Sequence, residues 1–415
     1  MRVLWFTNTP CNYRNQKGYG GGGWLIALQN EISQQHNITL GICFCMDGQP
    51  KKVEQKSTTY YPIPNHKKTT KDKIMDIIHY KDPSRDKILW PYYINKFKEV
   101  INDFQPDVIE VFGSELYTGL STIAAKELNI PCCLHVQGIL SLYIYGFLPQ
   151  GMSEGDYYFS QGIKKVYNKF QYLTYWKRSV YREKAILQAV PHVIGRTEWD
   201  KAAMSILAPQ AKYHYGGEIL RPCFYKQSER QIPKKIVITT TSSNASYKGF
   251  DLVLKIANIL KNEMHLDFTW NVYGNINPLF FERLTDIKHK EVNVRLCGVA
   301  TAEHLCDAML HSTIYVQPSY IENSPNSVAE AQILGIPVVA TNVGGTSSMV
   351  THGETGFLYP ATDPYMAAYY IKHLVDYLNT NIEMGENTHR VANQRHDKNI
   401  IIKQLIDTYH NILQK

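Results

Sequence analysis

The sequence has little of what membrane, secreted and zinc-binding proteins require. No stretch approaches the ~20 apolar residues of a membrane-spanning helix. The opening MRVLWFTNTP is too short for a secretory signal and has the length of a buried strand. The eight cysteines form no C-x-x-C pair and no zinc-finger spacing. We therefore expect a cytosolic protein whose thiols are reduced and fill its core.

Internal repeats, low-complexity segments and D-x-D sequences are also absent. The net charge of +7 is modest for a chain of 415 residues. Such a charge suits a phosphate-bearing or anionic-surface partner, whereas a nucleic-acid-binding protein would show stronger, clustered charge. We therefore expect no nucleic-acid partner.

Short apolar runs alternate with helical patterns along the whole chain, which is typical of α/β domains with a parallel sheet covered on both faces. The length predicts two to three domains, and a segment with two prolines and no clear period, 218–235, separates two such sets. The sequence therefore predicts domains at 1–217 and 236–390, a linker at 218–235, and a last helical pattern near 398–413 within 391–415. The predicted strands are Arg2–Thr7, Ile38–Met46, Val108–Val111, Cys132–Val136, Val193–Gly195, Ile236–Thr241, Thr269–Tyr273, Val292–Cys297, Ile314–Gln317 and Pro337–Thr341.

Two segments, 51–100 and 161–184, are more basic than the rest of the chain. In the second, lysines and arginines alternate with tyrosines and Trp176. Cations mixed with Tyr and Trp suit an anionic membrane surface. A solvated helix with its aromatic side chains turned inward explains the same pattern.

A glycine-rich loop follows the first predicted strand. Gly18, Gly20 and Gly23 match G-x-G-x-x-G, and Asp47 ends the second strand, as in dinucleotide-binding folds. About ten residues separate the first strand from Gly18, however, which is more than the tight turn of that fold accepts. The loop therefore favours backbone contact with a phosphate, with a flexible surface loop and a dinucleotide site as alternatives.

Residues 314–345, IYVQPSYIENSPNSVAEAQILGIPVVATNVGG, predict a helix of about ten residues between two buried strands. Ser324 is the expected N-cap, Pro325 the first turn, and Gly335 the position after the helix end. The helix would begin at the carboxyl edge of the sheet, where its free N–H groups favour a pyrophosphate. Glu322 and Glu330 would lie at different levels of one site, one near a sugar and one near a ribose diol, unless both are simply solvated.

The second half contains a series of further motifs, namely Tyr247-Lys-Gly-Phe-Asp251, Val272-Tyr-Gly274, Leu296-Cys-Gly298, the two glutamates, Gly335-Ile-Pro-Val-Val-Ala340, Val343-Gly-Gly345 and Gly353-Glu-Thr-Gly-Phe-Leu-Tyr-Pro360. These motifs resemble those of the retaining glycosyltransferases of family 4, the group 1 glycosyl transferases, which have the GT-B architecture. The match is strong over 236–360, moderate at the glycine loop and at His135-Val-Gln-Gly138, and weak elsewhere. The resemblance implies two Rossmann-like domains facing a central cleft, with the last helix crossing back to the first domain.

The resemblance also implies which residues act. His135 would face the acceptor or the transferring sugar, Lys248 would bind the donor pyrophosphate, and Glu322 would contact the donor sugar or its leaving phosphate. An exposed lysine at a helix end and a hydrogen-bonded histidine at a strand end are the simpler interpretations of Lys248 and His135. The implied donor-binding set is Gly22, Gly23, Ser243, Lys248, Gly274, Gly298, Val299, Glu322, Asn323, Ser324, Pro325, Asn326, Ser327 and Glu330.

Two positions depart from the family pattern. Ser243 stands where the family usually has an arginine, so another cation or polar group must complete the phosphate site. Glu322-Asn-Ser-Pro replaces the usual Glu-Gly-Phe-Gly, which changes side chains close to the sugar.

The activity implied is transfer of a hexosyl group from a UDP- or GDP-sugar to a glycan or lipid-linked acceptor hydroxyl, with retained anomeric configuration. It would need no cofactor and no metal ion, and it would serve cell-surface polysaccharide synthesis at the inner membrane face. A nucleotide-sugar epimerase of the same fold and an inactive nucleotide-sugar- or lipid-binding protein are the alternatives.

Overall fold

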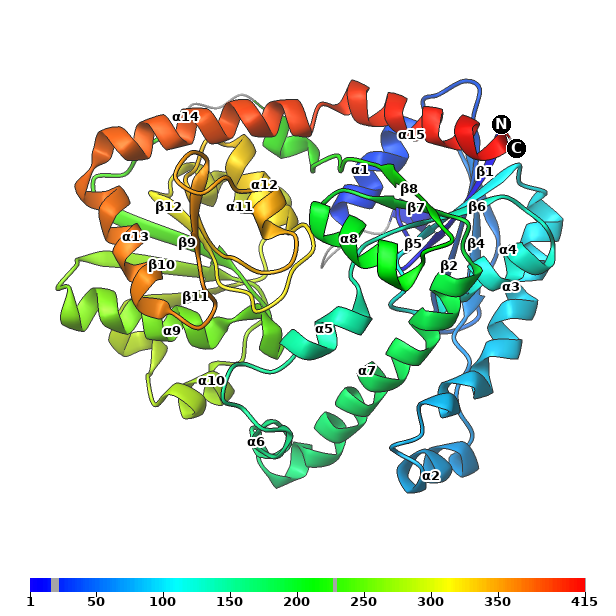
Figure 1. Cartoon of the computed structure of the whole chain (residues 1–415), viewed down its shortest axis with the longest axis horizontal. Coiled ribbons are helices and arrows are strands. Elements are labelled where there is room, and N and C mark those ends of the chain that lie inside the picture. Colours follow the sequence, from blue (N-terminus) through cyan, green and yellow to red (C-terminus); the bar gives the residue numbers. More distant parts are fainter. Residues whose placement is uncertain (16–21, 227–229, 415) are drawn as a thin grey trace. The chain divides into compact units, whose positions relative to one another are not determined.

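The computed structural model describes residues 1–15, 22–226 and 230–414. By their contacts, the residues group into two compact units. The first unit consists of Met1–Ile144, Gln171–Ile219 and His396–Lys415, and the second consists of Tyr145–Phe170 and Leu220–Arg395. Each unit is an α/β structure built on a mainly parallel sheet (Figure 1). This is the predicted fold class.

The sheet of the first unit has the strand order β3-β4-β2-β1-β5-β6-β7-β8, and all its pairings except β3 with β4 are parallel. Its strands are β1 (Arg2–Thr7), β2 (Thr39–Met46), β3 (Val53–Gln55), β4 (Thr58–Pro64), β5 (Val108–Phe112), β6 (Cys132–His135), β7 (His192–Gly195) and β8 (Lys212–Tyr215). The first unit contains the helices α1 (Gly23–Ile32), α2 (Thr70–Ile78), α3 (Trp90–Phe104), α4 (Ser121–Glu127), α5 (Leu140–Gly146, of which 145 and 146 group with the second unit), α8 (Glu198–Leu207) and α15 (Lys398–Leu413).

The sheet of the second unit is entirely parallel, with the order β11-β10-β9-β12-β13-β14. Its strands are β9 (Ile236–Thr241), β10 (Phe268–Tyr273), β11 (Val294–Gly298), β12 (Ile314–Gln317), β13 (Val338–Thr341) and β14 (Gly356–Tyr359). Its helices are α6 (Glu154–Phe159), α9 (Phe250–Asn258), α10 (Pro278–Thr285), α11 (Ala302–Leu310), α12 (Asn326–Ile333), α13 (Pro364–Asp376) and α14 (Leu378–Arg395). The long helix α7 (Ile163–Ala189) is divided between the units after Phe170.

The strand interiors explain why these segments are strands. In β1 every residue after Arg2 is buried, and β5, β6, β12 and β13 are buried throughout. Continuous apolar runs of this kind are stable only when helices cover both faces of a parallel sheet. Every strand predicted from the sequence is present, with ends that differ by at most two residues.

Four strands escape prediction, and β4 shows why. Pro62 and Pro64 argue against a strand in the sequence TTYYPIP. In the structure β4 pairs with β2 along its whole length, whereas β3 pairs with it only from Thr58 to Tyr60. Both prolines therefore lie beyond the end of β3, where the side of β4 opposite β2 has no partner among the described strands, and prolines whose missing N–H groups face that side do not interrupt the pairing.

The division into units differs from the predicted boundaries. Residues 145–170 group with the second unit, where Ser246 donates a hydrogen bond to the carbonyl oxygen of Phe147 and Lys169 lies over the Phe280 ring. The predicted linker 218–235 is also well packed in part, since Ile219 and Leu220 are fully buried. This grouping was not predictable, because contacts of a segment with distant elements leave no local period in the sequence.

The C-terminal helix α15 belongs to the first unit. Its Tyr409 hydroxyl accepts a hydrogen bond of 3.0 Å from Nε1 of Trp5 in β1, and both side chains are fully buried. No helix among the described residues is long and apolar enough to cross a membrane.

Candidate functional site

The central feature of the second unit is an ion pair at the carboxyl edge of its sheet. The strand order reverses between β9 and β12, and ligands of open α/β sheets bind outside the carboxyl ends of the strands at such a switch point. Lys248 follows β9 and Glu322 follows β12, and Lys248 Nζ lies 2.6 Å from Glu322 Oε1. Two residues predicted from separate motifs therefore meet at the switch point.

Burial and charge act in opposite directions on Lys248. Burial by itself lowers the pKa of its ammonium group, but the facing Glu322 carboxylate outweighs burial and holds the pKa above its usual value. The Lys248 side chain keeps 29% of its surface exposed. It therefore presents a permanent positive charge on a partly open surface.

Two glycines allow the backbone approach that forms this pair. Gly249 has a φ of +69°, and a Cβ added there would lie 1.9 Å from the carbonyl oxygen of Pro318. Gly344 has a φ of +51°, and its Cβ would lie 1.8 Å from the carbonyl oxygen of Glu322. Side chains at either position are excluded, which explains the glycines of the Lys-Gly and Val-Gly-Gly motifs.

Two residues that the sequence analysis missed hold the Glu322 carboxylate. Oε1 of Glu322 accepts hydrogen bonds from Ser319 Oγ at 2.8 Å and from Gln317 Nε2 at 3.2 Å. Glu322 is 6% exposed and Gln317 and Ser319 are less exposed still. The Gln-Pro-Ser sequence at the end of β12 was the available signal, because polar side chains directly after a buried strand lie at the ligand edge of a parallel sheet.

The helix after Glu322 starts later than predicted. Pro325, and not Ser324, is its N-cap, so α12 begins at Asn326 and has eight residues. Pro325 has an extended ψ of 114° and no side chain that could accept a hydrogen bond, so the N-cap residue itself does not cap the helix. The first N–H groups of a helix carry a partial positive charge that attracts an anion.

Side chains at this helix start are buried but incompletely bonded. Oδ1 of Asn326 is buried and has no hydrogen-bond partner, whereas Ser327 Oγ lies 3.3 Å from Gln317 Oε1. Asn323 is 1% exposed. As predicted, Gly335 follows the end of the helix with a φ of +74°.

Glu330 forms an ion pair within the second unit. Arg221 binds it in a bidentate manner, with Nε 2.7 Å from Oε1 and Nη2 2.8 Å from Oε2. Both residues belong to the second unit, and Arg221 comes from the segment predicted as linker. Arg221 was not predicted as part of the site, because it lies 109 positions before Glu330 in the chain.

The remaining donor-set residues of the second unit follow β9, β10 and β11. Ser243 Oγ accepts a hydrogen bond from the Ala245 N–H and so stabilises the turn after β9. Gly274 N–H donates to the Gly298 carbonyl at 2.8 Å, which places these two glycines side by side. Val299 is 63% exposed, although it is apolar.

In the first unit, His135 ends β6 and belongs to a buried chain of hydrogen bonds. Its Nδ1 lies 2.8 Å from Oε1 of Glu110, and the Tyr409 hydroxyl donates to Oε2 of the same carboxylate. His135 is 2% exposed and Glu110 is fully buried. Nε2 of His135 has no hydrogen-bond partner, so this ring nitrogen is held in place with its bonding capacity unused. Glu110 and Tyr409 were not predicted as part of this site, because no sequence pattern links an acid within an apolar strand to a tyrosine in a distant helix.

The glycine loop lies largely outside the described residues. Gly18 and Gly20, which gave the dinucleotide-like motif, are not described. Gly22 is the N-cap of α1 without a side-chain hydrogen bond, and Gly23 is the first residue of that helix. Asp47 is exposed and accepts a hydrogen bond from Asn65.

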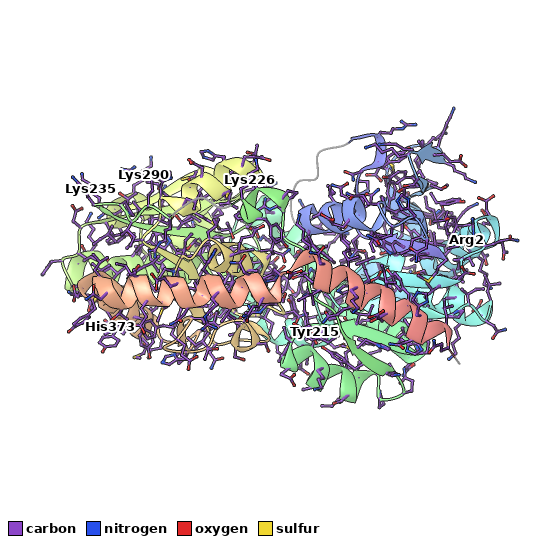
Figure 2. All side chains as sticks on the ribbon, turned by 90° about the horizontal axis from the view of Figure 1, so that it is seen from above. Arg2, Tyr215, Lys226, Lys235, Lys290 and His373 are labelled. Carbon is purple, nitrogen blue, oxygen red and sulfur yellow. The ribbon has the colours of Figure 1, made fainter. Side chains whose placement is uncertain are left out.

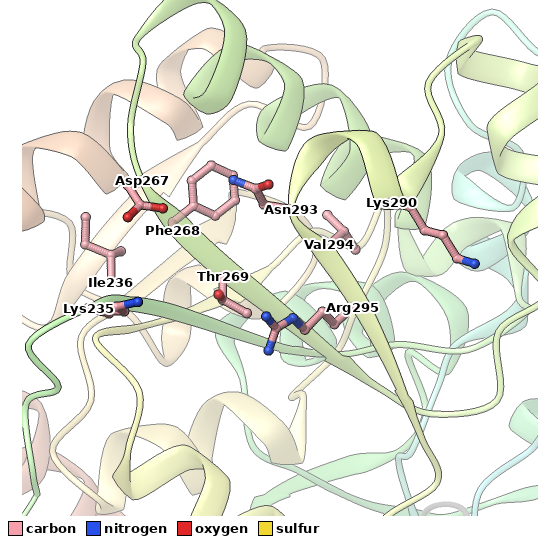
Figure 3. Close-up of a pocket in the computed structure, with 9 residues that line it drawn as sticks. All are labelled: Lys235, Ile236, Asp267, Phe268, Thr269, Lys290, Asn293, Val294 and Arg295. Carbon is pink, nitrogen blue, oxygen red and sulfur yellow. The ribbon is translucent and has the colours of Figure 1, made fainter.

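A separate cavity of about 440 Å³ lies at the opposite edge of the second sheet (Figure 3). Lys235, Lys290 and Arg295 are among its lining residues, which come from the amino ends of β9, β10 and β11. Figure 2 labels Lys235 and Lys290 on the second unit, and Figure 3 shows them on opposite sides of the cavity. Because it faces the amino ends of the strands, this cavity is not part of the site around Lys248. In the part of the chain that the structure describes, no three His, Cys, Asp or Glu side chains are grouped to hold a metal ion.

The family model described as "Glycosyl transferases group 1" matches residues 224–391. D-inositol 3-phosphate glycosyltransferase of Paenarthrobacter aurescens is 30% identical over 145 residues, which are 33% of this chain and 35% of that protein. The chain thus matches about a third of the length of this curated relative.

Solved structures match over nearly the whole chain. Sucrose-phosphate synthase of Thermosynechococcus elongatus has a TM-score of 0.72 at 17% identity, covering 99% of this chain and 98% of the other. Anabaena HepE in complex with UDP-glucose has a TM-score of 0.65 at 16% identity, covering 99% and 100%. Residues 224–391 are therefore similar to the group 1 glycosyl transferases, and the chain has the two-sheet α/β fold, GT-B, of these solved structures.

Proposed function

We propose that the protein is a retaining hexosyltransferase that uses a nucleoside-diphosphate sugar. The observation that supports this most is the pair formed by Lys248 and Glu322 at the switch point of the second sheet. A fixed ammonium group beside a helix N-terminus is the arrangement that a leaving diphosphate requires. The solved complex of HepE with UDP-glucose supports a UDP-sugar as the donor.

In the proposed reaction, Lys248 and the first N–H groups of α12 stabilise the negative charge that develops on the diphosphate as the glycosidic bond breaks. Glu322 holds the ammonium group in position through Oε1. Its other carboxylate oxygen, Oε2, accepts a hydrogen bond from a hydroxyl group of the donor sugar. The acceptor hydroxyl attacks on the face that the diphosphate leaves, and its proton passes to the leaving phosphate. The anomeric configuration is thereby retained, and no metal ion takes part.

The same proposal assigns binding roles to the other residues of the site. The backbone around Asn323 and Ser327 binds the phosphates and sugar hydroxyls, and Gly274, Gly298 and Val299 bind the base. Glu330 reaches the ribose while remaining paired with Arg221, whose positive charge adds to the phosphate site that Ser243 leaves incomplete.

In the first unit, His135 would bind the acceptor or the transferring sugar. Glu110 fixes the ring through Nδ1, so that the unpartnered Nε2 is the atom offered to a hydroxyl group. Gly22 and Gly23 would supply backbone N–H groups to the pyrophosphate. The acceptor would be a glycan or a lipid-linked glycan of the cell surface.

The test is release of nucleoside diphosphate from UDP- and GDP-sugars, with and without candidate acceptors, in the presence of EDTA. Transfer of labelled sugar supports the proposal. Conversion of the donor into its epimer without transfer would indicate an epimerase, and tight donor binding without turnover would indicate a binding protein. Either result would contradict the proposed activity.

A further inference from the structure

The helix α2 (Thr70–Ile78) lies on the first unit with its apolar side outward. None of its nine residues is buried. Ile74, Ile77 and Ile78 are 53%, 45% and 62% exposed. Since they are spaced i, i+3 and i+4, they share one face of the helix.

The opposite face of α2 is acidic and is bound to the protein. Asp76 forms ion pairs with Lys68 at 2.7 Å, with Arg178 at 3.0 Å and with Arg85 at 3.2 Å. Asp72 is used in the capping box with Thr69. A helix on the surface of a water-soluble domain normally buries its apolar side and exposes its charges, so the orientation of α2 is reversed.

Arginine 178 explains how this orientation is held. Its guanidinium group is 5% exposed and also donates to the carbonyl oxygens of Asp76 and His79, at the end of α2. Arg182, one turn later in α7, is fully buried and pairs with Asp86. Arg178, from the basic segment 161–184, therefore fixes α2 from within, and neither Arg178 nor Arg182 lies on the surface.

The exposed charges around the three isoleucines are mainly positive. Lys71 and Lys73 lie on the two sides of the apolar face by helical geometry, and both are exposed. Lys67 and Lys81, before and after the helix, are exposed as well. Within 65–88, all of which is described, Asp82 is the one exposed carboxylate.

We propose that α2 docks the first unit on an anionic lipid bilayer, with Ile74, Ile77 and Ile78 in the interface. An apolar helix face bordered by lysines is the pattern of an interfacial helix, in which the long side chains extend to the lipid phosphates. α2 lies at the opposite end of the first unit from α15, so the C-terminal helix does not cover it (Figure 1). The proposal is independent of the activity proposed above.

Co-sedimentation of the full-length protein with vesicles tests the proposal. The vesicles are phosphatidylcholine alone or an equimolar mixture with phosphatidylglycerol. We expect binding to the mixed vesicles that weakens as salt is added. The triple variant I74Q/I77Q/I78Q should bind about a hundredfold more weakly, and K71Q/K73Q roughly tenfold more weakly.

Two controls separate α2 from other surfaces. I206Q changes an isoleucine of α8 that is 79% exposed and should leave vesicle binding unchanged. K164Q/K165Q changes the exposed start of α7 and should have little effect. Glutamine keeps helix propensity, and circular dichroism and thermal unfolding of each variant establish that it is folded.

Three outcomes would overturn the proposal. The first is wild-type protein that does not bind the mixed vesicles, and the second is a triple variant that binds as well as wild type. The third is an isoleucine-dependent dimer in light scattering with no isoleucine-dependent vesicle binding, which would assign the face to a second copy of the chain.

Discussion

The pair of Lys248 and Glu322 permits a variant series in which stability and activity change separately. Replacing Lys248 by Met keeps the length of the side chain and leaves the Glu322 carboxylate without its cation. Removing one partner of a buried pair costs about 3–5 kcal/mol. Here Lys248 is 29% exposed and Glu322 keeps its hydrogen bonds to Ser319 and Gln317, so a loss of about 1–3 kcal/mol is expected. For a unit of this size that lowers Tm by about 2–4 °C per kcal/mol.

The double variant K248M/E322Q should recover the stability but not the activity. A glutamine at 322 is uncharged and can still accept the hydrogen bond of Ser319, so most of the lost Tm should return. Turnover should stay low, because the ammonium group that stabilises the diphosphate is still missing. Loss of one such group costs about 10²–10³ in kcat.

The assay is release of nucleoside diphosphate from the best donor, together with thermal unfolding of each variant. K288M is the matched control, because Lys288 is 72% exposed and pairs only with the exposed Glu291. It should change neither quantity. Normal turnover in K248M, or turnover that returns together with Tm in the double variant, would refute the role given to Lys248.

Three further predictions concern other parts of the structure. Tyr409→Phe removes the hydroxyl that donates to the buried Glu110, and should lower the free energy of unfolding by about 1–3 kcal/mol in urea titrations; an unchanged midpoint would contradict the buried network. Gly249→Ala places a Cβ 1.9 Å from a backbone oxygen, so it should destabilise the protein far more than Gly353→Ala, where φ is also positive but nothing lies within 4 Å; equal Tm losses would show that the close approach does not matter. Burial raises the pKa of Glu115 from 4.5 to about 7, so the folded state binds more protons than the unfolded state between these values and stability should fall as pH rises through that window. Glu115→Gln should flatten this part of the stability curve, and a slope equal to that of wild type would exclude Glu115 as its source.

Much of the fold was predictable because the strands of a parallel sheet are buried on both faces, so that their sequences are mostly apolar. Strands such as β1 and β13 are largely apolar runs, and their ends were found to within a residue or two. β4 was not predicted because its two prolines are typical of a loop. They are compatible with a strand here because β3 pairs with only the first three residues of β4. The predicted start of α12 was one residue too early, because a serine before a proline resembles an N-cap.

The candidate site was likewise predictable from the sequence only in part. The sequence by itself determined the strands and the place of Glu322 before a helix at the end of one of them, whereas Lys248 and the glycines of its motif were assigned by family resemblance. Only the tertiary structure decided that Lys248 contacts Glu322, that Arg221 forms an ion pair with Glu330, and that Glu110 orients His135. It also decided that α2 turns its isoleucines outward, because an amphipathic pattern gives the two faces of a helix but not which one the rest of the protein binds. Partners far apart in the chain are joined by long-range packing, which leaves no periodic trace between them.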